Sequence, residues 1–116
     1  MDTTSYAKLT GEISANLIQL RKGQPEMMRG FNALSQAAMA AGALDTKTKE
    51  LLALGIGVAT RCDGCIGFHT KALTQLGATR QEVEEVLGVA VYMGGGPSLM
   101  YAANALAAFG EFSEKK

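Results

Sequence analysis

Apolar residues recur along most of this chain at spacings of three and four, which is the pattern of one buried face of an α-helix. The first such segment is expected from about Thr4 to Arg21. A second begins at Pro25, whose fixed backbone angle suits a first helical turn, and stops near Gly42. No stretch alternates apolar and polar residues as a half-buried strand does. The pattern therefore favours helices over strands.

A third helix is predicted in TKTKELLALGIGVAT, with Asp45 or Thr46 as its cap. The later part of this segment is apolar on every side, which predicts a helix enclosed by others. A fourth helix is expected from about Arg61-Cys62 to Leu76, where Gly77 stops it.

The last two helices have clear start signals. Thr79 followed three residues later by Glu82 is a capping-box pattern for TRQEVEEVLGVAVYM. The run Gly94–Gly96 interrupts it, and Pro97 opens a sixth helix, SLMYAANALAAF, with the tail EFSEKK expected to fray. We see no repeat and no linker. The prediction is an all-α bundle of about six helices forming a single domain over residues 1–116.

Composition and charge limit the classes of function that this protein can have. Hydrophobic residues make up 47% of the 116, and the 11 basic and 11 acidic residues cancel. A neutral chain without a basic stripe argues against nucleic-acid binding and leaves room for self-association. The opening MDTTSYAKLT lacks a cationic start with an apolar run, and the longest apolar run, Leu51–Ala59, is too short to span a bilayer. We therefore expect a cytoplasmic protein that does not bind membranes.

Both cysteines and the only histidine lie within eight positions, in RCDGCIGFHTKAL. On a helix, Cys62, Cys65 and His69 fall within an arc of about 60°. Cys62 lies in the first turn, where unsatisfied N–H groups and the helix dipole favour a thiolate. Glycine is a costly choice inside a helix. We therefore expect Gly64 and Gly67 to leave space for a substrate or for a partner's sulfur.

Several interpretations of this cluster remain open from the residues alone. The cysteines could be inert core residues. A zinc site would need a fourth ligand, and Asp63 lies on another face of the helix while Glu50 is distant. A thioredoxin-type centre would follow a strand, and none is predicted before Cys62. Redox chemistry on a helical scaffold is the favoured interpretation. Glu50 begins a stripe that runs toward the cluster, although an acid early in a helix can simply face water.

The residues Glu50, Cys62, Cys65 and His69, separated by eleven, two and three residues, resemble the signature of AhpD-like proteins. These belong to the carboxymuconolactone decarboxylase superfamily. The following KAL-x-x-LGAT-x-x-E-x-x-E is also similar to the family. The resemblance extends from about Pro25 to Ala108 and implies an all-helical fold.

The resemblance implies a dithiol that reduces hydroperoxides or the disulfide of a partner protein. In that pattern the second cysteine, here Cys65, attacks the peroxide and becomes a sulfenic acid, and the first, here Cys62, resolves it to a disulfide. His69 and Glu50 would form a proton relay. The family's second histidine, just before the second cysteine, is replaced here by Gly64.

The resemblance also implies which cofactors, reductants and partner proteins the reaction involves. No cofactor or metal is bound; an external dithiol of the lipoyl type is the expected reductant, and a peroxiredoxin is a candidate partner protein. Family members usually assemble as trimers or hexamers, so self-association is expected. Two other functions stay open: a lactone decarboxylase with His69 and Glu50 as acid and base, and a non-catalytic helical assembly. The cysteine pair argues against the decarboxylase branch, which generally lacks it.

Overall fold

Six helices form the computed structural model, which describes residues 5–115. In chain order they are α1 (Tyr6–Gly23), α2 (Pro25–Met39), α3 (Thr46–Ala59), α4 (Asp63–Gln75), α5 (Arg80–Gly94) and α6 (Gly96–Glu114). No strand occurs within that range. The predicted all-α architecture of about six helices is confirmed. Thr4, the expected start of the first helix, lies outside the described residues.

The helix ends follow the predicted caps. Asp45 rather than Thr46 caps α3, because its carboxylate accepts from the backbone N–H of Thr48 at 2.7 Å. Thr79 and Glu82 form the full capping box of α5, each side chain accepting from the other's backbone N–H. Such local signals are readable from sequence because they depend on side chains three positions apart.

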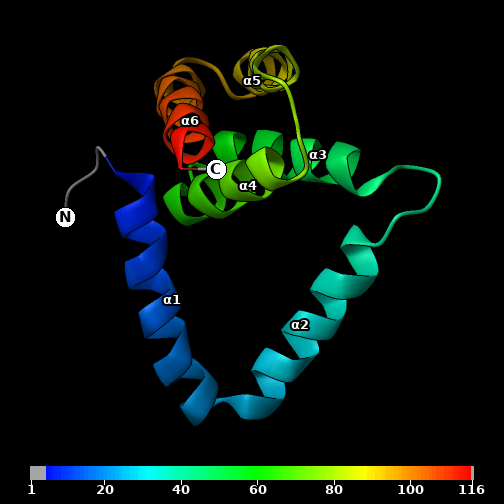
Figure 1. Cartoon of the computed structure of the whole chain (residues 1–116), viewed down its shortest axis with the longest axis vertical. Helices are drawn as coiled ribbons and strands as arrows, with labels where there is room; N and C mark the ends of the chain where they lie inside the picture. Colours follow the sequence, from blue (N-terminus) through cyan, green and yellow to red (C-terminus); the bar gives the residue numbers. More distant parts are fainter. Residues whose placement is uncertain (1–4, 116) are drawn as a thin grey trace.

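Helices α3 to α6 pack into one body, with α3 against α4 and α5, and α6 against the same two helices (Figure 1). Its centre holds apolar side chains with no exposed surface. These include Leu54, Val58, Ile66, Leu73 and Val83. Burying side chains of this size stabilises a fold by about 1.5–3 kcal/mol each. The fold therefore depends chiefly on this four-helix body.

The predicted fraying of the tail is wrong for the described residues, because α6 continues to Glu114. Phe109 and Phe112 are both buried at this end of the helix. Glu111 accepts hydrogen bonds from the Ser5 hydroxyl at 2.9 Å and from the backbone N–H of Tyr6 at 2.8 Å. The last turns of α6 and the start of α1 therefore stabilise each other.

Helices α1 and α2 form a V whose arms open toward this body and whose apex, the turn between the two helices, lies away from it (Figure 1). The first turns of α1 pack on α4 and α6, whereas α2 buries a single residue, Met28. The C-terminal end of α2 is connected to the start of α3. There the Thr46 hydroxyl donates a hydrogen bond to the carbonyl of Met39 at 3.2 Å. The second helix thus contributes little to the core of its own chain.

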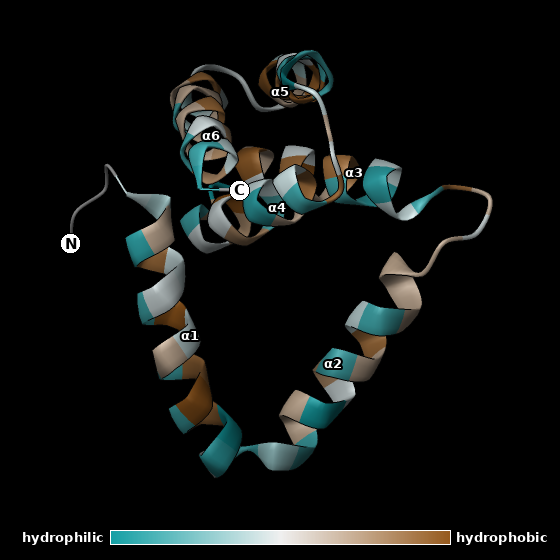
Figure 2. Cartoon of the chain, viewed as in Figure 1, coloured by the Kyte–Doolittle hydropathy of each residue, from teal (hydrophilic) through white to brown (hydrophobic). Residues whose placement is uncertain are grey.

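The expectation that the later part of α3 is enclosed is wrong for one of its faces. Leu54 and Val58 are buried, but Leu52 and Ile56 are exposed to solvent. Figure 2 shows apolar residues along α3 as well as along α1 and α2, and the exposed fractions show that several of them are not covered within the chain. Within residues 5–115, no helix is both long and apolar enough to cross a membrane.

Candidate active site

The turn between α3 and α4 places the first cysteine. The backbone N–H of Thr60 donates to the carbonyl of Ile56 at 2.8 Å, and that of Cys62 donates to Gly57 at 2.9 Å. Arg61 between them adopts a left-handed backbone, with φ of 60°. These are the bonds of a helix end closed by one left-handed residue. As a result, only Thr60 and Arg61 separate the end of α3 from Cys62, which is the N-cap of α4.

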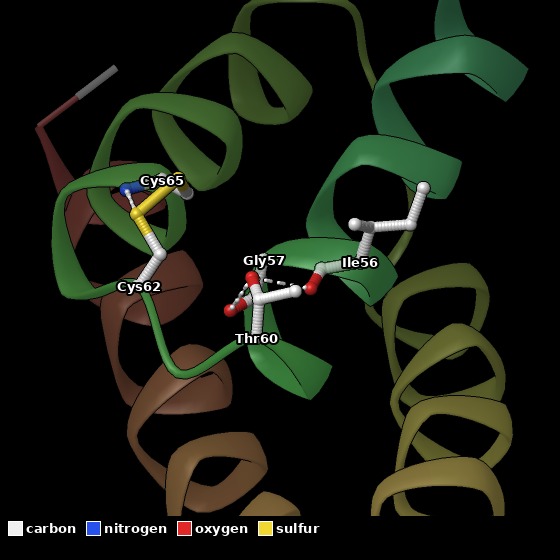
Figure 3. Close-up of a disulfide and its surroundings, with 5 residues drawn as sticks. All are labelled: Ile56, Gly57, Thr60, Cys62 and Cys65. Carbon is white, nitrogen blue, oxygen red and sulfur yellow. Dashed lines mark hydrogen bonds between the residues drawn. A yellow bond between two sulfur atoms is a disulfide. The ribbon is translucent and has the colours of Figure 1, made fainter.

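Cys62 and Cys65 are joined by a disulfide, with their Cα atoms 5.2 Å apart (Figure 3). The Cys62 sulfur also accepts from the backbone N–H of Cys65 at 3.1 Å, as an N-cap side chain does. Both residues are partly buried. The N-cap position favours negative charge, so it stabilises a thiolate on Cys62 once the disulfide is opened.

A glycine of α3 makes room for the second cysteine. A Cβ atom at Gly57 would lie 2.9 Å from the Cβ of Cys65, closer than real side chains approach. Gly57 lies beside the disulfide in Figure 3. The sequence alone does not show the neighbour that requires a glycine at this position.

Glu50 of α3 and His69 of α4 lie in direct contact, with Glu50 Oε2 and His69 Nδ1 2.6 Å apart. The side chain of Glu50 is 13% exposed and that of His69 is 29% exposed. A carboxylate accepts hydrogen bonds, so Nδ1 donates to Glu50 and Nε2 remains as the nitrogen that can exchange a proton. His69 follows Cys65 by four residues on one helix, which puts the two side chains on the same face. All four predicted site residues thus lie on α3, on α4 or at the turn between them.

The space beside Gly64 and Gly67 is filled by α1, so the expectation of open access there is wrong. A Cβ atom at Gly64 would lie 3.1 Å from the Ile13 side chain, and one at Gly67 would lie 2.5 Å from the Thr10 methyl group. The glycines therefore admit a helix and not a substrate. The close approach of Ile13 also leaves little room at position 64 for the histidine that related patterns carry.

Tyr6 and Asp63 form a contact that the sequence pattern did not indicate. The hydroxyl of the buried Tyr6 donates to Asp63 Oδ1 at 2.8 Å, which ties α1 to one of the two residues between the cysteines. Burial, followed by the hydrogen bond to the Asp63 carboxylate, raises the pKa of Tyr6 well above its usual range. The two residues are 57 positions apart, and no local spacing marks such a pair.

The site therefore combines a dithiol–disulfide pair at the start of α4 with a carboxylate–imidazole pair that joins α3 to α4. Within the part of the chain that the structure describes, no three His, Cys, Asp or Glu side chains are grouped so that they could hold a metal ion. The arrangement can form and open a disulfide, and it can supply or remove a proton next to it.

Comparison with known proteins places this site in a family. The sequence matches the carboxymuconolactone decarboxylase family over residues 25–108. A protein of that family from Legionella pneumophila has a crystal structure that superposes with a TM-score of 0.91 at 58% identity, covering 93% of this chain and 96% of that one. A second, from Thermotoga maritima, superposes with a TM-score of 0.81 at 30% identity, covering 90% of each chain. For the latter, involvement in the antioxidative response has been suggested.

A relative of known sequence extends the match over nearly the full length. An uncharacterized protein of Cupriavidus necator is 40% identical over 109 residues, covering 94% of this chain and 96% of its own. The fold and the positions of the helices are thus shared along almost the whole chain.

Proposed function

The chain belongs to the carboxymuconolactone decarboxylase family, and from this membership and the geometry of its site we propose that it reduces hydroperoxides with a dithiol. The observation that carries the proposal is the Cys62–Cys65 disulfide lying one turn from the Glu50–His69 pair. A peroxidase of this kind needs a nucleophilic thiol, a second thiol to resolve it, and a group that moves protons. Each of these is supplied by a named residue of α3, α4 or the turn between them.

In the first step, the Cys65 thiolate attacks one oxygen of the hydroperoxide. An S–O bond forms and the O–O bond breaks, so that Cys65 is oxidised to a sulfenic acid and the peroxide is reduced to an alcohol. The leaving alkoxide needs a proton. His69 Nε2 is the group that we assign to this transfer, because Nδ1 is held by Glu50 at 2.6 Å.

In the second step, the Cys62 thiolate attacks the Cys65 sulfur. The S–S bond forms, the S–O bond breaks and the oxygen leaves as water after accepting a proton. An external dithiol then reduces the disulfide by thiol–disulfide exchange and is itself oxidised to a disulfide. We propose a lipoyl-type dithiol or a redox partner protein for this role. Reductants of this kind operate in the cytoplasm, where we place the activity.

The proposal is tested by mixing the reduced protein with a small organic hydroperoxide and following thiol loss by stopped flow, with and without dihydrolipoamide. We expect two thiols to be lost per peroxide consumed and repeated turnover only when the dithiol is present. Cys65→Ser should abolish peroxide consumption, whereas Cys62→Ser should allow one turnover that stops at the sulfenic acid. Thiols of the wild type that do not react with peroxide would refute the proposal. Release of carbon dioxide from a lactone acid would favour a decarboxylase instead.

A further inference from the structure

Tyr6 and Asp63 form a pair beside the dithiol that the proposed reaction steps do not use. The Tyr6 hydroxyl donates to Asp63 Oδ1 at 2.8 Å. Asp63 directly follows Cys62 in the chain and is the first residue of α4. A carboxylate is therefore placed at the same helix end as the Cys62 sulfur, which becomes a second negative charge whenever its thiol ionises.

The two anions compete for the same donors. The first N–H groups of an α-helix have no partner within the helix, and they stabilise an anion that they bond. In α4 the N–H of Cys65 donates to the Cys62 sulfur at 3.1 Å, and that of Ile66 donates to the Cys62 carbonyl at 3.0 Å. Asp63 precedes Cys65 by two residues, a spacing at which an aspartate side chain can bond a backbone N–H. A carboxylate turned toward the helix would therefore take this donor from the sulfur.

The Asp63 carboxylate is instead directed to α1. Within residues 5–115, the hydrogen bond that it accepts comes from the Tyr6 hydroxyl and not from the backbone of α4. The N–H of Cys65 remains with the Cys62 sulfur. The contact between α1 and α4 thus decides which of the two groups the helix end stabilises.

Tyr6 is held firmly enough to fix the carboxylate. Only 5% of the residue is exposed, and its backbone N–H donates to Glu111 Oε1 of α6 at 2.8 Å. Its ring lies against α4, because a Cβ atom at Gly67 would lie 3.5 Å from Tyr6 Cδ1. Burial raises the pKa of Tyr6, so the hydroxyl keeps its proton over the range in which a cysteine ionises. Tyr6 is therefore a fixed donor at every pH at which the thiols titrate.

The other polar and charged groups around this pair have partners of their own or lie in solvent. On α6, Tyr101 and Asn104 interact with the Tyr6 hydroxyl, and Glu111 accepts from the start of α1. Glu50 of α3 and His69 of α4 are paired with each other, and Arg61 of the preceding turn is exposed. Asp63 is therefore the charged group whose direction depends on the Tyr6 hydroxyl.

We propose that Tyr6 is a positioning residue for the dithiol: it holds the Asp63 carboxylate away from the Cys62 sulfur, so that the first turn of α4 stabilises the Cys62 thiolate. This inference rests on the proposed dithiol chemistry and extends it. A more stable Cys62 thiolate increases the share of the nucleophile that attacks the Cys65 sulfenic acid near neutral pH. It also favours the open dithiol over the disulfide when an external thiol exchanges with the pair.

The first test measures the pKa of the Cys62 thiol from the rate of alkylation by iodoacetamide against pH, in a Cys65→Ser background that leaves one thiol. Tyr6→Phe keeps the ring and removes the hydroxyl, and should raise this pKa by about 0.5–1 unit, the effect of a nearby charge in a partly solvated site. Asp63→Asn should lower it. The double variant should match Asp63→Asn alone, because Tyr6 acts through the Asp63 charge. Tyr92→Phe, at a residue that is 84% exposed, is the control and should leave it unchanged.

The second test uses the intact cysteine pair in buffers of reduced and oxidised glutathione. Opening of the protein disulfide gives two protein thiols, while two glutathione thiols are oxidised to one glutathione disulfide. At a pH above the Cys62 thiol pKa of every variant, the shift in pKa appears in full in this equilibrium. Tyr6→Phe should therefore favour the disulfide by about three- to tenfold, and Asp63→Asn should favour the dithiol by a similar factor.

Circular dichroism establishes that each variant is folded. An unchanged or lower Cys62 pKa in folded Tyr6→Phe would overturn the proposal, and so would a double variant that keeps the Tyr6→Phe shift. If Tyr6→Phe does not fold, an unchanged pKa in folded Asp63→Asn is enough to overturn it. Neither measurement uses a peroxide. A protein that fails to reduce hydroperoxides can therefore still show the predicted order of pKa values, and an active peroxidase can fail to show it.

Discussion

Helices α3 to α6 and helices α1 and α2 differ in where their apolar side chains lie. In the four-helix body, Leu54, Ile66 and Leu73 have no exposed surface. In α2, Phe31 and Leu34 are as apolar but mostly exposed. Large apolar side chains occur in both regions, so their presence alone does not explain the difference. What differs is whether the rest of the chain covers them.

The two regions therefore differ in how much of their stability comes from the core of the chain itself. The body can be stabilised by its own core, and it also carries Glu50, Cys62, Cys65 and His69. The α2 helix buries only Met28 within the described residues, so the core of the chain contributes little to its stability. The first turns of α1 join the two regions through Tyr6, which is buried against the body. Substitutions of apolar residues in the two regions should therefore differ in how much they lower the free energy of unfolding.

The largest effect is expected for Leu54→Ala, which removes a fully buried side chain of α3. Loss of such a side chain leaves a cavity and lowers the free energy of unfolding by about 3 kcal/mol. Urea unfolding should show this loss at every protein concentration. Leu34→Ala is the matched control on α2, and in dilute solution it should cost no more than about 0.5 kcal/mol. Equal losses in dilute solution would contradict the division into two regions.

A second large effect is expected within the body alone. Glu50→Gln and His69→Gln should each slow peroxide reduction by about 100-fold, since general acid–base catalysis contributes at least that much. The double variant should lose far less than the product of the two, because the residues act as one unit. Stopped-flow rates measured against pH should also show thiol reactivity moving to higher pH. Leu34→Ala, outside the body, should retain the wild-type rate; unchanged rates in both site variants would exclude the relay.

The helix count, the caps and the cysteine–histidine cluster could be predicted because each depends on neighbours within one or two helical turns. The role of Glu50 could not be predicted from local spacing, because its contact with His69 joins positions 19 apart. Gly64 and Gly67 were misinterpreted because a glycine in a sequence shows that space is needed without showing what fills it. Here Ile13 and Thr10 of α1 fill it.

The exposed face of α3 could not be predicted for a related physical reason. A segment that is apolar all round predicts burial, but the sequence does not say whether the covering surface belongs to the same chain. Leu54 is covered within the chain, and Ile56 is not. Likewise, the buried Phe112 shows why the tail does not fray, although the surrounding EFSEKK is mostly polar.

An intermediate effect is expected where the two regions join. Gly67→Ala would bring a methyl group to 2.5 Å from the Thr10 side chain and force α1 away from α4. Overpacking costs about 1–3 kcal/mol, and the gain in helix propensity offsets about 1 kcal/mol of it. Urea unfolding should show a net loss, with faster amide hydrogen exchange in the first turns of α1. Gly88→Ala, with nothing within 4 Å, should instead be neutral or stabilising. The same response at both glycines would mean that α1 does not pack closely on α4.

The smallest effect is expected from Tyr6→Phe, which removes only the hydroxyl that donates to Asp63 at 2.8 Å. The loss should be about 1 kcal/mol at neutral pH, since water can reach the partly exposed Asp63 carboxylate in its place. Because burial raises the pKa of Tyr6, the neutral hydroxyl is favoured in the folded state. Its contribution is complete below about pH 10, where an unfolded tyrosine ionises, and is lost as the pH rises from there through the higher folded value. The free energies of unfolding of wild type and Tyr6→Phe, measured in urea, should therefore converge above that pH.

The largely exposed Tyr92 provides the control, because Tyr92→Phe should leave stability unchanged across the same range. A constant difference between wild type and Tyr6→Phe at all pH values would mean that the hydroxyl acts through packing and not through its bond to Asp63.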